Sequence, residues 1–369
     1  MVLKKVILPA ILFVFYSGFL SAQSSWAIFR GNQQLSGAIS ASLPEKPKLL
    51  TSFQTGDDIK ASPVISGQTI FCGSTDGTMY AIGFDGKLKW KFDSGNAIEA
   101  PALLLDGSVV FGQLDGLFYR LDEKSGKQIW KYKTDNQIMG SANWLKVGSQ
   151  YRLVVGSYDY NLHAVGFAKG DSIWQYESDN YINGAPGIYG KNAVFGGCDG
   201  FLHLVNIESG KVFKKIQLAT YIASSPVIDG KYAYVGDYEG KFFSIDLEAG
   251  KIAWTYHEKD KNLPFIASPA LSGNFIVIGN QDKFIYCLDK STGKVVWKVK
   301  TSNRVESSSV IASGKVITGT MDGMLYIHDL KTGAELWKYE LGSPIIGSPA
   351  VVSGKIVVGA GDGRIYIFG

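Results

Sequence analysis

Residues 121–130 read LDEKSGKQIW, and the chain repeats this pattern along its length. Close copies are IDLEAGKIAW (245–254), LDKSTGKVVW (288–297) and HDLKTGAELW (328–337), and looser copies are IGFDGKLKW (82–90), VGFAKGDSIW (165–174) and VNIESGKVFK (205–214). Each copy predicts a strand, a tight turn that needs glycine, and a second strand that leads to a tryptophan. A pattern that returns at a fixed period indicates an array of similar units.

A glycine followed three residues later by an acid occurs eight times. The glycines are Gly73, Gly112, Gly156, Gly196, Gly236, Gly279, Gly319 and Gly359, and the acids are Asp76, Asp115, Asp159, Asp199, Glu239, Asp282, Asp322 and Asp362. Successive glycines are 39, 44, 40, 40, 43, 40 and 40 residues apart. Glycine follows the acid in six copies, which predicts hairpins because glycine adopts positive φ without a steric clash. We interpret the acids as turn formers that bond to nearby backbone.

Aromatic or imidazole side chains recur at two further places in each unit. Four residues beyond the acids lie Tyr80, Tyr119, His163, His203, Phe243, Tyr286, Tyr326 and Tyr366; fourteen or fifteen residues beyond lie Trp90, Trp130, Trp174, Phe213, Trp254, Trp297 and Trp337. Short runs of small residues start each unit and suit a crowded common axis. Four short strands at a period of about 40 residues indicate a β-propeller, with the tryptophans packed between its blades.

Seven units are complete, and the eighth, residues 348–369, lacks its fourth strand. Residues 48–55 can supply that strand, with Phe53 in the tryptophan position. This arrangement closes the ring and leaves no open edge between the first and last blades. The sequence therefore predicts an all-β fold: an eight-bladed propeller of four-stranded antiparallel blades, spanning residues 48–369.

The first 22 residues have the pattern of a secretory signal peptide. Lys4 and Lys5 precede an apolar run over residues 6–20, and the small residues Ser21 and Ala22 follow. A membrane anchor would need a longer run, of about 20 apolar residues, and no cysteine follows for a lipid anchor. We expect an exported protein, periplasmic or secreted. Residues 23–47 are then a leader that covers one face of the ring.

Charge and cysteine content narrow the function further. The formal net charge of +4 includes Lys4 and Lys5, and basic residues are scattered among acidic ones without a Lys/Arg run. Nucleic acid is therefore not an expected partner. The three cysteines, Cys72, Cys198 and Cys287, lie in different repeats and are interpreted as small buried residues, not as a disulfide framework. A monomer is expected.

The repeat [LIHV]-D-x-x-[TSA]-G-x-x-x-W resembles the tryptophan-docking motif of the pyrroloquinoline-quinone-like propellers, over essentially the whole mature chain. The leader WAIFRGNQQLSG (26–37) is similar to the opening of the same superfamily. One branch of it, the quinoprotein dehydrogenases, holds the quinone and Ca²⁺ over the ring axis. Another is non-catalytic and includes the propeller lipoprotein of outer-membrane β-barrel assembly. The compact blades here resemble the second branch, although the lipidated cysteine is missing.

The resemblance places any ligand at one mouth of the axis. The second residues of the segments that begin the first strands are expected there: Lys60, Glu99, Met139, Asn183, Ala223, Ile266, Glu306 and Ile346. Of these, Lys60, Glu99, Asn183 and Glu306 are the candidate cofactor-binding residues, and Lys60 with Glu99 can equally form a structural ion pair between blades. No catalytic or metal-binding residues are predicted, since carboxylates do not cluster and His163 and His203 stand where other repeats have packed tyrosines.

Residues 257–264 (HEKDKNLP) form an extended link between the fifth and sixth units. Together with Asp57, Asp58, Tyr181 and Tyr221, this link predicts a face that binds a partner, because loops on a rigid ring commonly carry recognition. The alternative is a solvated insertion without consequence, since surface loops tolerate added length.

Three functions follow from these patterns. The leading one is an exported, non-enzymatic scaffold that binds a protein partner at the cell envelope and needs no cofactor. The alternative is a small quinone-dependent dehydrogenase with pyrroloquinoline quinone and calcium at the axis. A third, a carbohydrate-binding propeller, is suggested by the many tyrosines and tryptophans alone.

Overall fold

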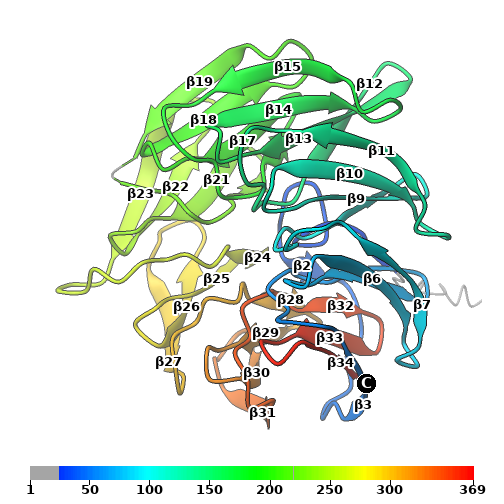
Figure 1. Cartoon of the computed structure of the whole chain (residues 1–369). Helices are drawn as coiled ribbons and strands as arrows, with labels where there is room; N and C mark the ends of the chain where they lie inside the picture. The colour runs from blue at the N-terminus through cyan, green and yellow to red at the C-terminus, as the bar shows by residue number, and fades with distance from the viewer. Residues whose placement is uncertain (1–24, 219) are drawn as a thin grey trace, which may run out of the picture.

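The computed structural model describes residues 25–218 and 220–369, so the predicted signal peptide lies outside the described residues. Every regular element in this part of the chain is a strand. The strands form eight sheets arranged in a ring, each built on four antiparallel strands (Figure 1). The predicted all-β, eight-bladed propeller is therefore confirmed. A helix long and apolar enough to span a membrane does not occur in the described ranges.

Each blade runs from a short innermost strand to an outermost strand. Blades 1 to 4 are β4 (Val64–Ser66), β5 (Thr69–Gly73), β6 (Thr78–Gly83) and β7 (Leu88–Asp93); β8 (Leu103–Leu105), β9 (Ser108–Gly112), β10 (Leu117–Asp122) and β11 (Gln128–Lys133); β12 (Asn143–Val147), β13 (Gln150–Gly156), β14 (Asn161–Gly166) and β15 (Ser172–Glu177); β16 (Gly187–Tyr189), β17 (Asn192–Gly196), β18 (Phe201–Asn206) and β19 (Val212–Gln217).

The second half of the ring repeats this order. Blades 5 to 8 are β20 (Val227–Asp229), β21 (Tyr232–Gly236), β22 (Lys241–Asp246) and β23 (Lys251–His257); β24 (Ala270–Ser272), β25 (Phe275–Gly279), β26 (Phe284–Asp289) and β27 (Val295–Lys300); β28 (Val310–Ala312), β29 (Lys315–Gly319), β30 (Met324–Asp329) and β31 (Glu335–Glu340); β32 (Ala350–Val352), β33 (Lys355–Gly359), β34 (Arg364–Phe368) and β3 (Leu49–Gln54).

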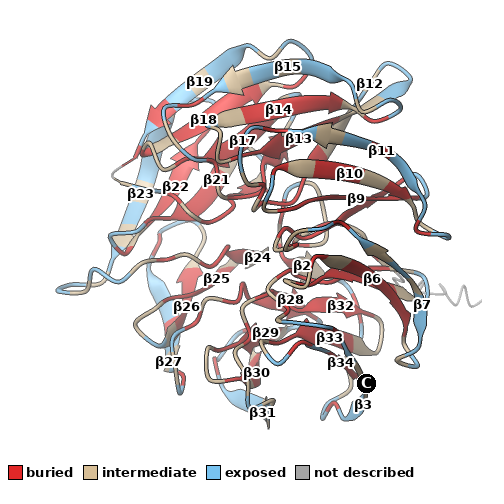
Figure 2. Ribbon diagram, in the orientation of Figure 1, coloured by how far each residue is buried: buried red, intermediate tan, exposed pale blue. Residues whose placement is uncertain are grey.

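Burial follows the position of a strand within its blade. The second and third strands are almost wholly buried, whereas the outermost strands alternate exposed side chains with side chains of mostly intermediate burial (Figure 2). Each second strand ends at its repeat glycine, and in blade 1 the following acid forms the hairpin: Asp76 Oδ1 accepts the backbone N–H of Thr78 at 2.8 Å. The prediction that the acids form the turns is confirmed in blades 1, 3, 4, 6 and 8. In blade 5 the acceptor is Asp237 and not Glu239, and in blades 2 and 7 Gln113 and Thr320 accept the turn N–H groups.

The small-residue runs meet at the axis. Serine hydroxyls accept backbone N–H groups from the preceding blade: Ala185 to Ser225 at 2.8 Å, Ser225 to Ser268 at 3.0 Å, and Ser268 to Ser308 at 2.9 Å. Side chains larger than these would not fit between neighbouring backbones. The innermost strands β32 and β4 also contact each other, which closes the ring.

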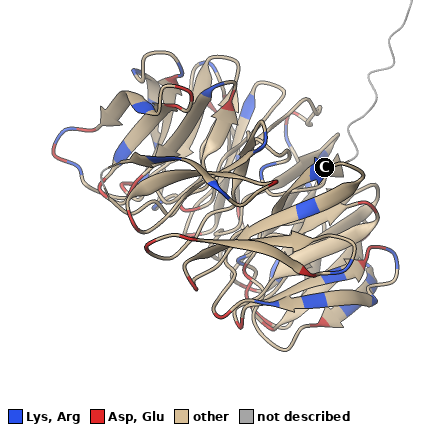
Figure 3. Ribbon diagram, turned by 90° about the horizontal axis from the view of Figure 1, so that it is seen from above, with Lys and Arg blue, Asp and Glu red and all other residues tan. Residues whose placement is uncertain are grey.

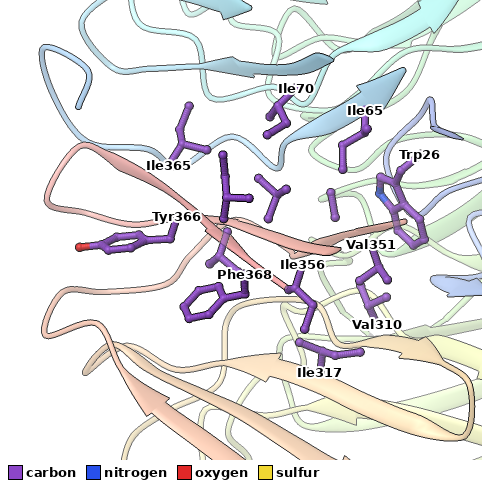
Figure 4. Packing of buried hydrophobic residues seen from close by; sticks show 14 of the residues in the cluster. Trp26, Ile65, Ile70, Val310, Ile317, Val351, Ile356, Ile365, Tyr366 and Phe368 are labelled. Carbon is purple, nitrogen blue, oxygen red and sulfur yellow. The ribbon is translucent and has the colours of Figure 1, made fainter. Parts of the chain in front are cut away.

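Strand β3 completes blade 8 by pairing with β34, so the predicted closure by the N-terminal strand is confirmed. Buried residues of blades 1, 7 and 8 form one cluster, which includes Trp26, Ile65, Ile317 and Phe368 (Figure 4). The two ends of the chain are thus held by a shared hydrophobic core.

The register of β3 differs from the predicted one. Thr51, not Phe53, occupies the tryptophan position, because Thr51 pairs with Ile367, the residue after the ring position of this blade. Phe53 lies two residues further along and packs against Tyr80 of blade 1, with 5.5 Å between ring centroids. The prediction for Phe53 is wrong because β3 reaches the blade without the connecting turn from which the other tryptophans are counted.

Blade 4 contains a second register error. Lys214, not Phe213, occupies the tryptophan position, since it pairs with Leu204. The Phe213 side chain is 56% exposed, and the Lys214 ammonium group donates to the carbonyl of Leu247 in blade 5 at 3.0 Å. The prediction for Phe213 is therefore wrong: successive side chains on a strand point to opposite faces, so the neighbour of an inward residue points outward.

The leader lies inside the ring against the innermost strands. Its strands β1 (Ser25–Trp26) and β2 (Ala38–Ile39) pair with β4 and β28. Leader carbonyls accept backbone N–H groups from five further blades: Leu104 to Ala27, Ile188 to Gln33, Ile228 to Gln34, Leu271 to Ser36 and Gly354 to Ser42. Asn143 of blade 3 donates its side-chain amide to Gln33. The leader therefore contacts all eight blades.

Candidate functional site

The hairpins between second and third strands share one face of the ring with the links between blades. In each blade a hairpin N–H bonds to the carbonyl of the incoming link, as Tyr238 does to Tyr221 at 3.0 Å and Gln281 to Pro264 at 3.4 Å. We call this the upper face. The lower face carries the remaining turns. Basic and acidic residues are interspersed around the ring (Figure 3).

A pocket of about 220 Å³ opens at the upper mouth of the axis; we call it the axial pocket. Six of the eight predicted mouth residues line it: Lys60, Met139, Asn183, Ala223, Ile266 and Ile346. Phe29 of the leader also lines it, so the leader narrows the channel below. Glu99 and Glu306 do not line the pocket.

The two glutamates beside the axial pocket are bound to cations. Lys60 Nζ lies 2.7 Å from Glu99 Oε1, so the predicted ion pair between blades 1 and 2 is confirmed. The hydrogen bond to Glu99 raises the pKa of Lys60 and keeps it charged. Glu306 pairs with Arg304 at 3.0 Å and accepts a hydrogen bond from Gln281 at 3.0 Å. Both carboxylates are therefore neutralised by the protein itself.

Asn183 is a further polar residue of the pocket, which six serines also line. Its amide nitrogen lies 3.1 Å from the sulfur of Cys198. Its Oδ1 atom is buried and has no hydrogen-bond partner among residues 25–218 and 220–369. Burial raises the pKa of the Cys198 thiol, so this cysteine is a neutral neighbour at neutral pH. The pocket thus offers one unused acceptor to a ligand that can donate.

The two predicted histidines are structural. His163 and His203 are buried, and each bonds through Nε2 to the acid of its own hairpin, Asp159 or Asp199, at 2.9 Å. In blades 1, 6 and 8 the tyrosine hydroxyl takes the same place, as Tyr80 does with Asp76 at 2.6 Å. Within the described residues, three or more His, Cys, Asp or Glu side chains are nowhere grouped so that they could hold a metal ion.

Tryptophans of the outermost strands reach the next blade. Five indole N–H groups donate to a backbone carbonyl there: Trp90 to Glu123, Trp130 to Phe167, Trp174 to Ile207, Trp254 to Lys290 and Trp297 to Leu330, at 2.9–3.1 Å. Trp337 packs against Phe368 of blade 8, with 5.8 Å between centroids. Blade 8 has no connecting turn between β34 and β3, so Trp337 does not meet the same arrangement.

Exposed tyrosines lie on the upper face, in the hairpins of blades 3 and 5 and in the links that lead into blades 4 and 5; we call them the tyrosine rim. Its members are exposed by 40% (Tyr160), 38% (Tyr181), 53% (Tyr221) and 44% (Tyr238). Tyr181 stacks on Tyr158 at 4.7 Å and contacts Tyr160 at 5.2 Å, and Tyr221 meets Tyr238 at 6.4 Å. Burial raises the pKa of Tyr158 to about 12, so the ring at the base of this stack stays neutral.

The link at residues 257–264 lies on the same face. Its charged groups bond to blade 6, with Lys261 2.9 Å from Asp282 and Glu258 3.0 Å from Lys298. Leu263 remains 47% exposed, and its backbone lies beside Gly240 in the hairpin that carries Tyr238. The link and this half of the tyrosine rim are therefore neighbours.

The sequence interpretation found only part of this site. It identified Tyr181 and Tyr221 but missed Tyr160 and Tyr238, which occupy the hairpins that follow the repeat glycines. Comparing the eight hairpins position by position would have shown tyrosines in blades 3 and 5 alone. The leader residue Phe29 could not be placed at the pocket, because no repeat relates it to the blades.

These features define an eight-bladed propeller of pyrroloquinoline-quinone-like repeats with a leader inside the ring and a pocket at the axis. A family model described as outer membrane protein assembly factor BamB matches residues 34–256, 146–299 and 281–368. The chain belongs to this family.

The solved structures and the curated relative that are similar to this chain include a BamB protein and dehydrogenases. BamB from Moraxella catarrhalis superposes with a TM-score of 0.75 at 15% identity, over 87% of this chain and 99% of that one. A europium-containing methanol dehydrogenase gives 0.80 at 15% identity, over 94% and 98%. The quinoprotein alcohol dehydrogenase PedE of Pseudomonas putida is 40% identical over 75 residues, which are 20% of this chain and 12% of that relative. At such identities the superpositions show a shared fold.

Proposed function

We propose that the protein is an exported, non-enzymatic scaffold that binds a protein partner at the cell envelope through its upper face. The tyrosine rim carries this proposal. Four tyrosines with 38–53% exposure gather on blades 3 to 5, beside the exposed Leu263. Tyrosine is enriched at protein interfaces because its rigid ring buries a large apolar area and its hydroxyl still finds a hydrogen bond.

The family supports this choice of partner. Its model is described by a role in outer membrane protein assembly, and a component of that assembly is the partner we propose. Rigid blades would hold the rim in place, so that little conformational entropy is lost on binding.

The test is site-specific photo-crosslinking in the native envelope. A photoreactive amino acid at Tyr221 should capture one dominant protein, identified by mass spectrometry as an outer-membrane assembly component. The same label at Leu88, which is 45% exposed on the outer strand β7, is the matched control and should capture none. Equal capture at both positions would contradict the proposal. Replacing Tyr221 and Tyr238 together by serine should weaken the binding of that partner by about tenfold or more.

The alternative function is a quinone-dependent dehydrogenase, which the structural likeness to a methanol dehydrogenase and the unpaired Asn183 Oδ1 favour. The donor set of the axial pocket fits a quinone and Ca²⁺ poorly. Ca²⁺ takes six to eight oxygen ligands, whereas Glu99 and Glu306 lie outside the pocket lining and are each paired with a cation.

Titration of the purified protein with pyrroloquinoline quinone and Ca²⁺ separates the two functions. Under our proposal the quinone does not bind in a saturable way, and dye-linked oxidation of ethanol or glucose stays at the level of the buffer. Saturable binding that is lost in Asn183→Leu, together with alcohol oxidation, would establish the enzyme instead.

A further inference from the structure

A hollow of about 340 Å³ lies between blades 5 and 6, beside the turns of the lower face that carry Asp229 and Lys290. We call it the blade 5–6 groove. It is lined by Asp229, Tyr232, Tyr234, Ser244, Trp254 and Lys290. Tyr234 and Ser244 form its buried floor, each with 2% exposure. The proposed function does not use this groove.

The groove opens beside a turn residue of blade 6 that is polar where four other blades have a buried apolar side chain; blade 2, with Glu123, also has a polar residue at this position. After the first position of this turn, blades 3, 4, 5 and 7 place an apolar side chain that is at most 6% exposed: Phe167, Ile207, Leu247 and Leu330. Blade 6 places Lys290 there, and its ammonium group reaches back to Asp229 of blade 5 at 2.7 Å. The ion pair bridges the space that an apolar side chain fills in blades 3, 4, 5 and 7.

A short side chain on the third strand of blade 5 deepens the same space. Ser244 pairs with Trp254 across two strands, and in blade 2 the residue that pairs with the tryptophan is Arg120. The guanidinium group of Arg120 lies 3.7 Å from the centre of the Phe167 ring and donates to the Phe167 carbonyl at 2.7 Å. Arg120 thereby fills the interface between blades 2 and 3. Ser244 is short, as are Ala81 and Ala164 at the same position in blades 1 and 3, and so it leaves room beside Trp254.

We propose that the blade 5–6 groove binds a neutral carbohydrate. Its rings, Tyr232, Tyr234 and Trp254, offer apolar faces on which the C–H face of a pyranose can stack. Ser244, Ser291 and the Asp229–Lys290 pair offer donors and acceptors to the sugar hydroxyls. The two charges already compensate each other, so a neutral ligand leaves no buried charge unpaired. The volume lies within the range of about 300–1,000 Å³ typical of small-molecule sites.

An apolar side chain of a protein partner fits the lining less well. It would cover the rings but make no hydrogen bond to Ser244 or to the Asp229–Lys290 pair while displacing water from them, and hydrogen bonds lost in this way are costly. A polyhydroxylated ring satisfies both parts of the lining.

The experiment follows the indole N–H signal of Trp254 by nuclear magnetic resonance in the full chain, assigned with Trp254→Phe. The probes are maltotriose, cellotriose and tri-N-acetylchitotriose. We expect one of them to shift this signal in a saturable way, with a Kd on the order of 1 mM, as is usual for a small solvated ligand. The signal of Trp130, at the filled interface, should stay unmoved.

Two variants close the groove by copying other blades. Lys290→Leu restores the apolar residue of blades 5 and 7, and Ser244→Arg copies blade 2; both should abolish the shift. Ser209→Arg, in the exposed turn of blade 4, is the matched control and should keep it. Lys290→Leu tests the proposal even where Ser244→Arg fails to fold. Binding that persists in Lys290→Leu, no shift by any trisaccharide at millimolar concentration, or a shift by the peptide Leu-Tyr-Leu alone would overturn the carbohydrate assignment.

Discussion

Asp159 and His163 lie four residues apart in a hairpin and stabilise each other. Asp159 accepts the backbone N–H groups of Asn161 and Asp135, each at 3.0 Å, as well as the imidazole of His163 at 2.9 Å. Burial alone would raise the pKa of Asp159, but the hydrogen bond and charge of His163 with these N–H groups outweigh it and lower the pKa to about 2. The hairpin acid is therefore a stabilising group with a pH signature.

We predict that Asp159→Asn lowers the free energy of unfolding at pH 7 by about 1–2 kcal/mol, because the charged acceptor is lost. Since the folded pKa lies below the ordinary 3.8, this contribution is present above pH 3.8 and is lost as the pH falls to about 2. Urea denaturation of both proteins between pH 7 and pH 2 measures it. The exposed Glu340→Gln is the control, and a difference that does not change with pH would disprove this account.

Gly170 of blade 3 lies against the indole of Trp130 from blade 2, and this contact shows why the repeat needs glycine at that position. Its φ is +73°, and a Cβ atom there would lie 2.6 Å from Cδ2 of Trp130. We predict that Gly170→Ala lowers the free energy of unfolding by about 2–4 kcal/mol, from backbone strain and overpacking together. Gly148→Ala in the same blade is the matched control: its φ is +61° with no heavy atom within 4 Å, so it should cost about 1 kcal/mol. Equal losses in thermal and urea denaturation would show that the indole contact does not matter.

The outermost strand β19 is where one blade departs from the repeat. Lys214 lies over Gly250, with its Cδ 3.4 Å from the position of a Cβ, and donates to Leu247. An indole at this position could donate to the same carbonyl and bury more apolar area. We predict that Lys214→Trp raises the free energy of unfolding by about 1 kcal/mol. Phe213→Ala should change it by less than about 0.5 kcal/mol, because that side chain is largely in solvent. A large loss in Phe213→Ala would reverse the assignment of the two positions.

The strands and hairpins could be predicted from the sequence, because each depends on residues that are close together in the chain. The hairpin at Asp76 and Gly77 depends on neighbouring residues, so the repeat alone gives the strands and, by counting, the eight blades. The prediction for Phe213 was wrong because aromatic character was weighed above the register of the strand; fifteen residues beyond Asp199 lies Lys214. The prediction for Phe53 was wrong because β3 has no connecting turn from which its register can be counted. The blade 5–6 groove was not visible, because it arises from Ser244 and Lys290, which lie in different blades and meet only in the folded ring.

At the scale of the whole molecule, the leader ties the ring together from within. Arg30, 1% exposed, donates to the carbonyls of Pro269 at 2.8 Å and Ser308 at 3.2 Å, and so joins the leader to the innermost segments of blades 6 and 7. A propeller gains most of its stability from contacts between adjacent blades. The leader contacts all eight blades, so it also links blades that are not adjacent in the ring.

We predict that Arg30→Ala lowers the free energy of unfolding by about 2–4 kcal/mol, because two buried carbonyls lose their donor and a cavity remains. Amide hydrogen exchange locates the effect: the N–H groups of Ile188, Ile228 and Leu271, which bond to leader carbonyls, should exchange faster, and that of Phe118 in β10 should change less. Arg30→Met retains most of the side-chain volume but cannot donate hydrogen bonds. Its free energy of unfolding should lie between those of the unchanged protein and Arg30→Ala, which separates the contribution of packing from that of hydrogen bonding. Uniformly faster exchange in every blade would mean that Arg30 supports the ring as a whole without holding the leader in place.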